Sequence, residues 1–192
     1  MQPKDVLLVL TDRWADWEAS FAIAEVNSAS RYVIRTIAVD KSSKTSIGGI
    51  RAEIDYEISE YQITDNLAMI ILPGGFSWKE ESHDEIASFV RKAESMNIPI
   101  AAICGATIFL GKHGFLDRRK HTGDDLDLFM CEQGYNGREL YTPAQVVTDM
   151  GFVTANETAS VEFSREIFRI LRIDSEDEIE KWYDNFKNGV FH

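Results

Sequence analysis

The stretch Ile98-Pro99-Ile100-Ala101-Ala102-Ile103-Cys104-Gly105-Ala106-Thr107-Ile108-Phe109-Leu110-Gly111 decides the fold of this chain. It begins as an apolar run with the length of a strand that is buried on both faces. After Cys104 the apolar residues Ala106, Phe109 and Leu110 recur at helical spacing. A strand that turns sharply into a helix through small residues is a nucleophile elbow, which lifts the side chain at the turn away from the backbone. We therefore expect Cys104 to face solvent there.

The chemistry of such a position favours a reactive thiol. The first turn of a helix supplies free N–H groups and the positive end of the helix dipole, and both lower the pKa of a nearby thiol. The alternative is that Cys104 is only a small apolar residue at the end of a strand, because free cysteine is often buried in protein cores. Cys131, the other cysteine, is expected to be structural, and two cysteines do not predict a disulfide scaffold.

Strand-like and helix-like segments alternate along the rest of the chain. Buried strands are expected at 6–10, 32–39, 68–72 and 98–103, helices at 16–26, 83–96, 105–111, 125–132, 158–171 and 174–187, and hairpins at 45–55 and 144–155. This alternation predicts an α/β fold with a doubly wound, mostly parallel sheet flanked by helices, flavodoxin-like, with a small β-hairpin. The length fits a single domain, residues 1–192, with a C-terminal helix at about 174–188 packed on it.

Four candidate site residues, in three places, follow strands that should end at one edge of the sheet. Glu18 comes after the first strand, the pair Gly74-Gly75 after the strand at 68–72, and Cys104 at the elbow. Sites in doubly wound sheets lie at the carboxyl ends of the strands, so we expect these residues to converge. Each candidate also has a simpler interpretation. Glu18 could be a surface carboxylate in the first turn of a helix capped by Asp16, and Gly74-Gly75 could serve only to allow a tight turn.

Composition excludes several classes of function. The chain has 20 basic and 32 acidic residues, a formal net charge of −12, which argues against binding to nucleic acid or to an anionic membrane surface. It contains no apolar run of membrane-spanning length and begins without the pattern of a signal peptide, so a cytoplasmic location is expected. Its four histidines have no metal-ligand spacing, and neither a metal nor a cofactor is expected.

Several short motifs carry a resemblance to a known family. They are Asp16-Trp17-Glu18, Leu72-Pro73-Gly74-Gly75, Ala101-Ala102-Ile103-Cys104-Gly105-Ala106, and Thr154-Ala155-Asn156 with Ser160-Val161-Glu162-Phe163. From Val6 to about Leu171 the chain resembles the DJ-1/PfpI superfamily, within the class I glutamine amidotransferase-like fold. The resemblance implies that related proteins are often homodimers and that the substrate is a small molecule.

The resemblance also implies roles for the candidate residues. Cys104 would be the nucleophile, and Glu18 would hydrogen-bond to its sulfur. The N–H groups of Gly75 and Gly105, with Gly74 adjacent, would form the pocket for an oxyanion or another anion. Burial would have to keep Glu18 protonated, because a second negative charge would oppose the thiolate.

This sequence departs from the family pattern in its histidines. Intracellular proteases of the family have a histidine directly after the cysteine, where this chain has Gly105. The C-terminal region lacks the histidine–glutamate pair of glutamine amidotransferases, so that activity is not expected. Glyoxalase- and deglycase-type members use a histidine some twenty residues past the cysteine. His121, seventeen residues past it, is the candidate base, or else a polar loop residue, and His113 is the other candidate, or else a surface residue of a helix.

Two classes of function follow. In the first, the protein is a cysteine-dependent hydrolase or a glyoxalase- or deglycase-like enzyme, in which Cys104 attacks a small carbonyl or amide substrate. In the second, it is a non-catalytic stress-response protein or redox sensor that acts through oxidation of Cys104. A third hypothesis is that the protein is a scaffold in which the Cys104 thiol has no functional role. A histidine within proton-transfer reach of the sulfur would favour the enzyme.

Overall fold

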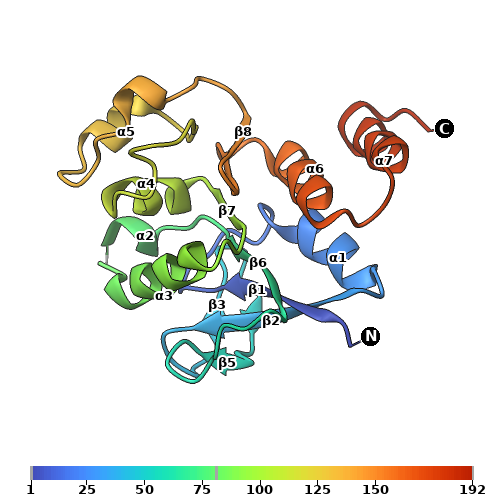
Figure 1. Cartoon of the computed structure of the whole chain (residues 1–192), viewed down its shortest axis with the longest axis horizontal. Helices are drawn as coiled ribbons and strands as arrows, with labels where there is room; N and C mark the ends of the chain where they lie inside the picture. Colours follow the sequence, from blue (N-terminus) through green and yellow to red (C-terminus); the bar gives the residue numbers. More distant parts are fainter. Residues whose placement is uncertain (1, 81, 192) are drawn as a thin grey trace.

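The computed structural model describes residues 2–80 and 82–191, and its centre is a seven-stranded sheet (Figure 1). The strands lie in the order β5-β2-β1-β6-β7-β9-β8. Their bounds are β1 Lys4–Val9, β2 Tyr32–Ala38, β5 Tyr56–Glu57, β6 Leu67–Leu72, β7 Ile100–Ile103, β8 Val146–Asp149 and β9 Phe152–Ala155. All neighbours in this sheet pair in parallel except β8 and β9, which form an antiparallel hairpin at one edge. The predicted doubly wound, mostly parallel sheet is confirmed.

Helices cover both faces of the sheet. On one face lie α2 (Ser77–Glu80), α3 (Asp84–Ser95), α4 (Gly105–Lys112) and α5 (Leu126–Met130), and on the other lie α1 (Ser20–Ser28), α6 (Ser160–Leu171) and α7 (Glu176–Asn188) (Figure 1). A short 3-10 helix spans Arg138–Leu140. Successive residues of β1 alternate between the two cores: Leu7 and Val9 belong to one, Val6 and Leu8 to the other. The strand is therefore apolar throughout because both of its faces are buried.

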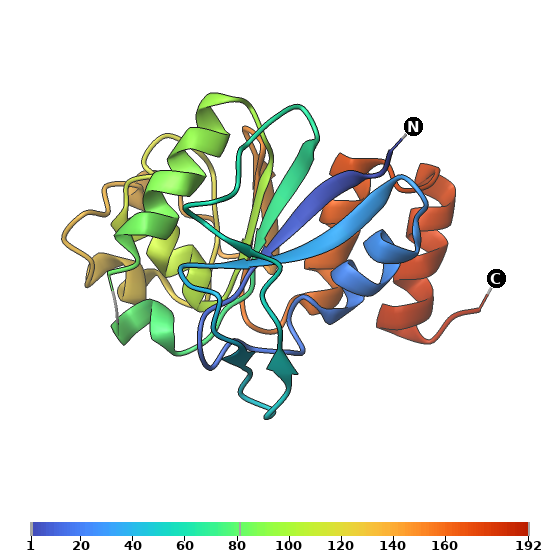
Figure 2. The same ribbon diagram turned by 90° about the horizontal axis from the view of Figure 1, so that it is seen from below.

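A small antiparallel hairpin, β3 (Lys44–Thr45) with β4 (Arg51–Ala52), projects from the body of the molecule (Figure 2). Asp16 anchors it, because its Oδ2 accepts hydrogen bonds from the Ser46 hydroxyl at 2.6 Å and from the Gly48 N–H at 3.1 Å. The predicted hairpin is confirmed. The prediction that Asp16 caps a helix is wrong, because its carboxylate is used by the hairpin and α1 begins only at Ser20.

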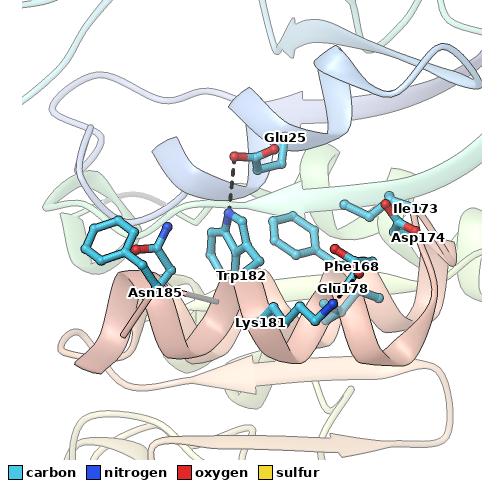
Figure 3. A pocket seen from close by; sticks show the side chains of 10 residues that line it. Glu25, Phe168, Ile173, Asp174, Glu178, Lys181, Trp182 and Asn185 are labelled. Atoms are coloured by element: carbon cyan, nitrogen blue, oxygen red, sulfur yellow. Dashed lines mark hydrogen bonds and ion pairs between the residues drawn. The ribbon is translucent and has the colours of Figure 1, made fainter. Parts of the chain in front are cut away.

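Helix α7 packs on α6 and reaches α1 (Figure 3). The Trp182 indole N–H donates to Oε1 of Glu25 in α1 at 3.1 Å, and its ring meets the edge of Phe168 in α6 at 4.7 Å between centroids. The C-terminal helix expected at about 174–188 therefore lies against α6 and α1 through Trp182, whereas Phe186 is 46% exposed. Among the described residues, no helix combines the length and the apolar character needed to span a membrane.

Candidate active site

Cys104 stands alone between β7 and α4 in a strained backbone conformation. Its φ of 54° and ψ of −129° lie outside the regions that residues other than glycine readily adopt. Its N–H donates to the Ala155 carbonyl at 2.9 Å, and its carbonyl accepts from the Thr107 hydroxyl at 2.6 Å. An added Cβ on Gly105 would lie 2.9 Å from the Gly75 carbonyl oxygen. The geometry is that of the predicted elbow, and it requires a small residue after the cysteine.

Glu18 lies beneath the thiol and is completely buried. Its Oε2 accepts a hydrogen bond from the Gly74 N–H at 2.6 Å. Within the described part of the chain its Oε1 has no nitrogen or oxygen partner, and the Cys104 thiol is the group beside the carboxyl. Burial raises the pKa of Glu18 to about 7, although the hydrogen bonds with Gly74 and Cys104 lower it in part. Glu18 is therefore not a surface carboxylate, and near neutral pH much of it is protonated.

Gly74 is the position where the backbone, Glu18 and Cys104 come closest together. An added Cβ there would lie 2.5 Å from Glu18 Oε2 and 2.7 Å from the Cys104 Cβ. Contacts of this length are not tolerated, so the glycine is needed for the approach of three elements and not only for a turn.

Gly75 forms an isolated β-bridge with Trp14 in the loop after β1. The bridge consists of the Ala15 N–H donating to the Gly74 carbonyl at 2.9 Å and the Phe76 N–H donating to the Arg13 carbonyl at 3.3 Å. The Gly75 N–H takes part in neither hydrogen bond. It therefore stays available as one of the two predicted oxyanion donors, with the Gly105 N–H as the other.

Two acidic residues that the sequence analysis did not select also reach the thiol. The sulfur of Cys104 and one carboxylate oxygen each of Asp124 and Glu157 lie within 4.8 Å of one another. Asp124 lies in the loop before α5 and accepts a hydrogen bond from the Glu157 N–H at 2.7 Å, while Glu157 follows β9. Asp124 is twenty residues past Cys104, the spacing at which the resemblance implies a histidine, and this spacing was the signal that could have identified it.

The acidic surroundings reverse one expectation about Cys104. Burial raises the pKa of its thiol well above the usual range, and the nearby carboxyl groups of Glu18 and Asp124 raise it further. The hydrogen bond with the Gly105 N–H lowers the pKa but does not outweigh them. The expected low thiol pKa is therefore wrong, because the dipole of a short helix is opposed by two carboxyl groups and by desolvation.

Comparisons with known proteins identify the family of this chain. A sequence model of the DJ-1/PfpI family matches residues 4–170. The chain belongs to the DJ-1/PfpI family. Two relatives from Bacillus subtilis are named uncharacterized protease YoaZ, 36% identical over 191 residues (95% of this chain, 90% of the relative), and uncharacterized protease YdeA, 34% identical over 189 residues (98% and 94%).

Solved structures of other family members have the same fold. A thiJ/pfpI family protein from Bacillus anthracis superposes with a TM-score of 0.90 at 32% identity, covering 99% of this chain and 93% of that protein. The DJ-1 superfamily protein Atu0886 from Agrobacterium tumefaciens gives a TM-score of 0.89 at 26% identity, with coverages of 97% and 98%.

His121 occupies a different environment in this DJ-1/PfpI chain. It is completely buried, with Nδ1 2.8 Å from the Arg119 carbonyl oxygen and Nε2 2.8 Å from the Tyr135 hydroxyl. The carbonyl can only accept, so Nδ1 carries the proton and Nε2 accepts from Tyr135. Burial lowers the pKa of His121. Both ring nitrogens are thus engaged by structural partners, and the side chain acting on the thiol from this part of the chain is that of Asp124.

His113, the other candidate base, lies at the end of α4. Its Nε2 is 3.0 Å from the Ser82 carbonyl oxygen, and its ring lies against Phe109. These contacts match the interpretation of His113 as a residue of the helix surface. Cys131, expected to be structural, is instead exposed and free.

Proposed function

We propose that this DJ-1/PfpI protein is a cysteine-dependent hydrolase of a small amide or related carbonyl compound. The observation that supports this most is the position of Asp124, which has a carboxylate oxygen within 4.8 Å of the Cys104 sulfur at the elbow. The names of the two Bacillus relatives, uncharacterized proteases, are consistent with hydrolysis. The reaction therefore needs one nucleophile, Cys104, and one proton carrier, Asp124.

The first step transfers the thiol proton and forms a carbon–sulfur bond. Asp124 takes the proton of Cys104 while the sulfur attacks the carbonyl carbon, because the high pKa of the thiol leaves little free thiolate. The carbonyl π electrons move to oxygen. The N–H groups of Gly75 and Gly105 are the donors that would stabilise the oxyanion.

The second step expels the leaving group. The oxyanion re-forms the carbonyl, the carbon–nitrogen bond breaks, and Asp124 returns the proton to the departing nitrogen. A thioester on Cys104 remains. Asp124 then takes a proton from a water molecule, whose oxygen attacks the thioester carbon. The carbon–sulfur bond breaks, Asp124 returns the proton to the sulfur, and a carboxylic acid and the free thiol are released.

Glu18 serves this chemistry as a buried acid that is neutral below its pKa of about 7. In the neutral form it presents a hydrogen-bond donor to the sulfur rather than a second full negative charge. The redox-sensor alternative would be favoured by a sulfur with no base nearby, whereas here a carboxylate oxygen of Asp124 lies within 4.8 Å of the Cys104 sulfur.

The test is turnover by the purified protein on a panel of small amides, esters and α-oxoaldehydes. We expect hydrolysis that is abolished in Cys104→Ala and reduced about 100- to 10,000-fold in kcat in Asp124→Asn, the usual contribution of a general acid–base residue. His113→Gln, a surface control, should leave the rates unchanged. Turnover that survives Cys104→Ala, or wild-type rates in Asp124→Asn, would refute the mechanism. Activity on α-oxoaldehydes alone would show the glyoxalase-type reaction instead.

A further inference from the structure

Three metal-binding groups from distant parts of the chain meet at the candidate site. The sulfur of Cys104 and one oxygen each of Asp124 and Glu157 lie within 4.8 Å of one another. Cys104 and Asp124 are half-buried, whereas Glu157 is exposed, so the cluster is open to solvent on one side. Among the ion pairs formed by the described residues, none neutralises Asp124 or Glu157.

A second observation on the inner side of this cluster is the unpaired oxygen of Glu18. The Glu18 side chain is fully buried, and its Oε1 has no nitrogen or oxygen partner in the described structure. The carboxyl lies beside Cys104, since both groups crowd the same face of Gly74. A buried carboxyl oxygen with only the Cys104 thiol beside it is costly unless a proton or a cation satisfies it.

We propose that Cys104, Asp124 and Glu157 form a site for a divalent cation of the zinc type, with Glu18 Oε1 on its buried side. One thiolate with carboxylates favours Zn²⁺ and its borderline-soft relatives over Mg²⁺ and Ca²⁺, which prefer oxygen ligands alone. Solvent at the open side would supply a further ligand. Such a cation would also neutralise an acidic cluster with which no basic side chain of the described residues is paired.

The ligand spacing is compatible with this cation after a small movement. Tetrahedral zinc with ordinary bond lengths places its sulfur and oxygen ligands about 3.4 to 3.6 Å apart. The observed limit of 4.8 Å therefore requires one side chain to move inward by roughly 1 Å. Glu157 can do this, because its side chain is exposed while its N–H remains fixed to Asp124.

Binding is a ligand exchange without oxidation or reduction. The sulfur–hydrogen bond of Cys104 breaks, the proton goes to solvent, and the sulfur electron pair binds the cation. A sulfur held in this way cannot attack a carbonyl carbon. If the proposed hydrolase function is correct, zinc therefore inhibits the enzyme. Only this inhibition, and not zinc binding itself, depends on that function.

The experiment is a titration of the metal-free wild-type protein with Cd²⁺, followed by the ultraviolet charge-transfer absorbance of a cadmium–thiolate bond. Competition with Zn²⁺ then gives the zinc affinity. The variants are Cys104→Ser, Asp124→Asn and Glu157→Gln. The matched controls are Cys131→Ser, which removes the exposed cysteine, and Asp127→Asn, which removes an exposed carboxylate of α5 close in sequence to Asp124.

We expect one cadmium per chain, with the absorbance band kept in both controls and lost in Cys104→Ser. The affinity should fall at least about tenfold in Asp124→Asn and in Glu157→Gln. No band in the wild type, a band that disappears with Cys131→Ser, or unchanged affinity in either carboxylate variant would overturn the proposal. Because no substrate is present, this result is independent of whether the protein hydrolyses amides.

Discussion

Glu18 is a carboxyl group that folding transfers from water into the protein interior. Its pKa is 4.5 before folding and about 7 in the folded chain, chiefly because burial disfavours the charged form. Below about pH 4.5 both states are protonated and the full stability is present. Between the two values the unfolded chain releases its proton first, so the free energy of unfolding falls as pH rises through about 7.

This linkage gives the first prediction. Glu18→Gln has no proton to lose, so its stability should lack the part of the wild-type decline between about pH 5 and pH 8 that comes from this group, about 3 kcal/mol. The measurement is urea unfolding at both pH values in the presence of a chelator. Glu85→Gln, on the exposed side of α3, is the control and should keep the wild-type slope. Equal slopes in wild type and Glu18→Gln would contradict the assignment of Glu18 as a buried neutral acid.

A second prediction concerns Gly74. A methyl group in Gly74→Ala would meet Glu18 and the Cys104 Cβ at distances shorter than contact, so we expect a loss of about 1 to 3 kcal/mol in the free energy of unfolding. Displacement of the thiol should also remove activity. In the control Gly49→Ala the added methyl meets nothing within 4 Å, but φ is +83°, so a loss of about 1 kcal/mol with full activity is expected.

At the scale of single residues, the sequence predicted the nucleophile Cys104 but not all of the residues around it. Cys104, Gly105 and the glycine pair could be selected because they lie within three residues of the ends of β7 and β6, whereas Glu18 lies in the loop after β1 and was selected because that loop should reach the same edge of the sheet. Asp124 lies in a loop, beyond a segment whose path depends on tertiary contacts such as those of buried His121. Its spacing of twenty residues from Cys104 was a signal, but that signal implied a histidine, and whether a loop carboxylate reaches the sulfur depends on the path of the loop.

At the scale of the elements, helices α6 and α7 are joined by a partly buried ion pair. Glu162 of α6 accepts from the Lys187 ammonium at 2.8 Å and from the Tyr183 hydroxyl at 3.0 Å. Burial alone would raise the pKa of Glu162, but the hydrogen bonds from Lys187, its own backbone N–H and Tyr183 outweigh burial and lower it. The pair therefore stabilises the fold above the unfolded pKa, and this stabilisation is lost as pH falls through the folded pKa.

The third prediction follows from this pair. Lys187→Gln leaves the Glu162 carboxylate buried with one partner fewer, so we expect a loss of about 1 to 2 kcal/mol in the free energy of unfolding at neutral pH, with a smaller loss in acid. Tryptophan fluorescence during urea unfolding measures this loss in the free energy of unfolding. Lys181→Gln removes a pair with Glu178 in which both side chains are about half exposed, so its effect on the free energy of unfolding should be smaller than that of Lys187→Gln. Equal effects of the two substitutions would contradict the coupling.

Element types were predictable from periodicity, whereas element ends were not. The helix expected from residue 16 begins at Ser20 because Asp16 binds the hairpin, a contact between segments thirty residues apart in sequence. The helices expected at 158 and 174 begin at Ser160 and Glu176, within two residues of the predicted positions. Periodicity reports which face is buried, while the first residue of a helix depends on where its neighbours find partners.

At the scale of the whole molecule, the assembly implied by the resemblance stays a prediction. We expect a homodimer, with a solution mass of about twice the 21.8 kDa of one chain. Light scattering coupled to size-exclusion chromatography measures this mass directly. A single-chain mass at micromolar concentration would exclude the dimer and leave the site to be completed by one chain alone.

The projecting β3–β4 hairpin matters for engineering of this protein, because it is linked to the candidate active site. Its tip stands clear of the body and looks expendable, yet the residue that ties it down, Asp16, lies two positions before Glu18. Shortening the tip, or grafting a new peptide onto it, would weaken the hydrogen bonds to Asp16. The short segment from Asp16 to Glu18, which positions the buried carboxyl group, would then be held less firmly. The most accessible loop for engineering is thus mechanically linked to the least accessible carboxyl group of the site.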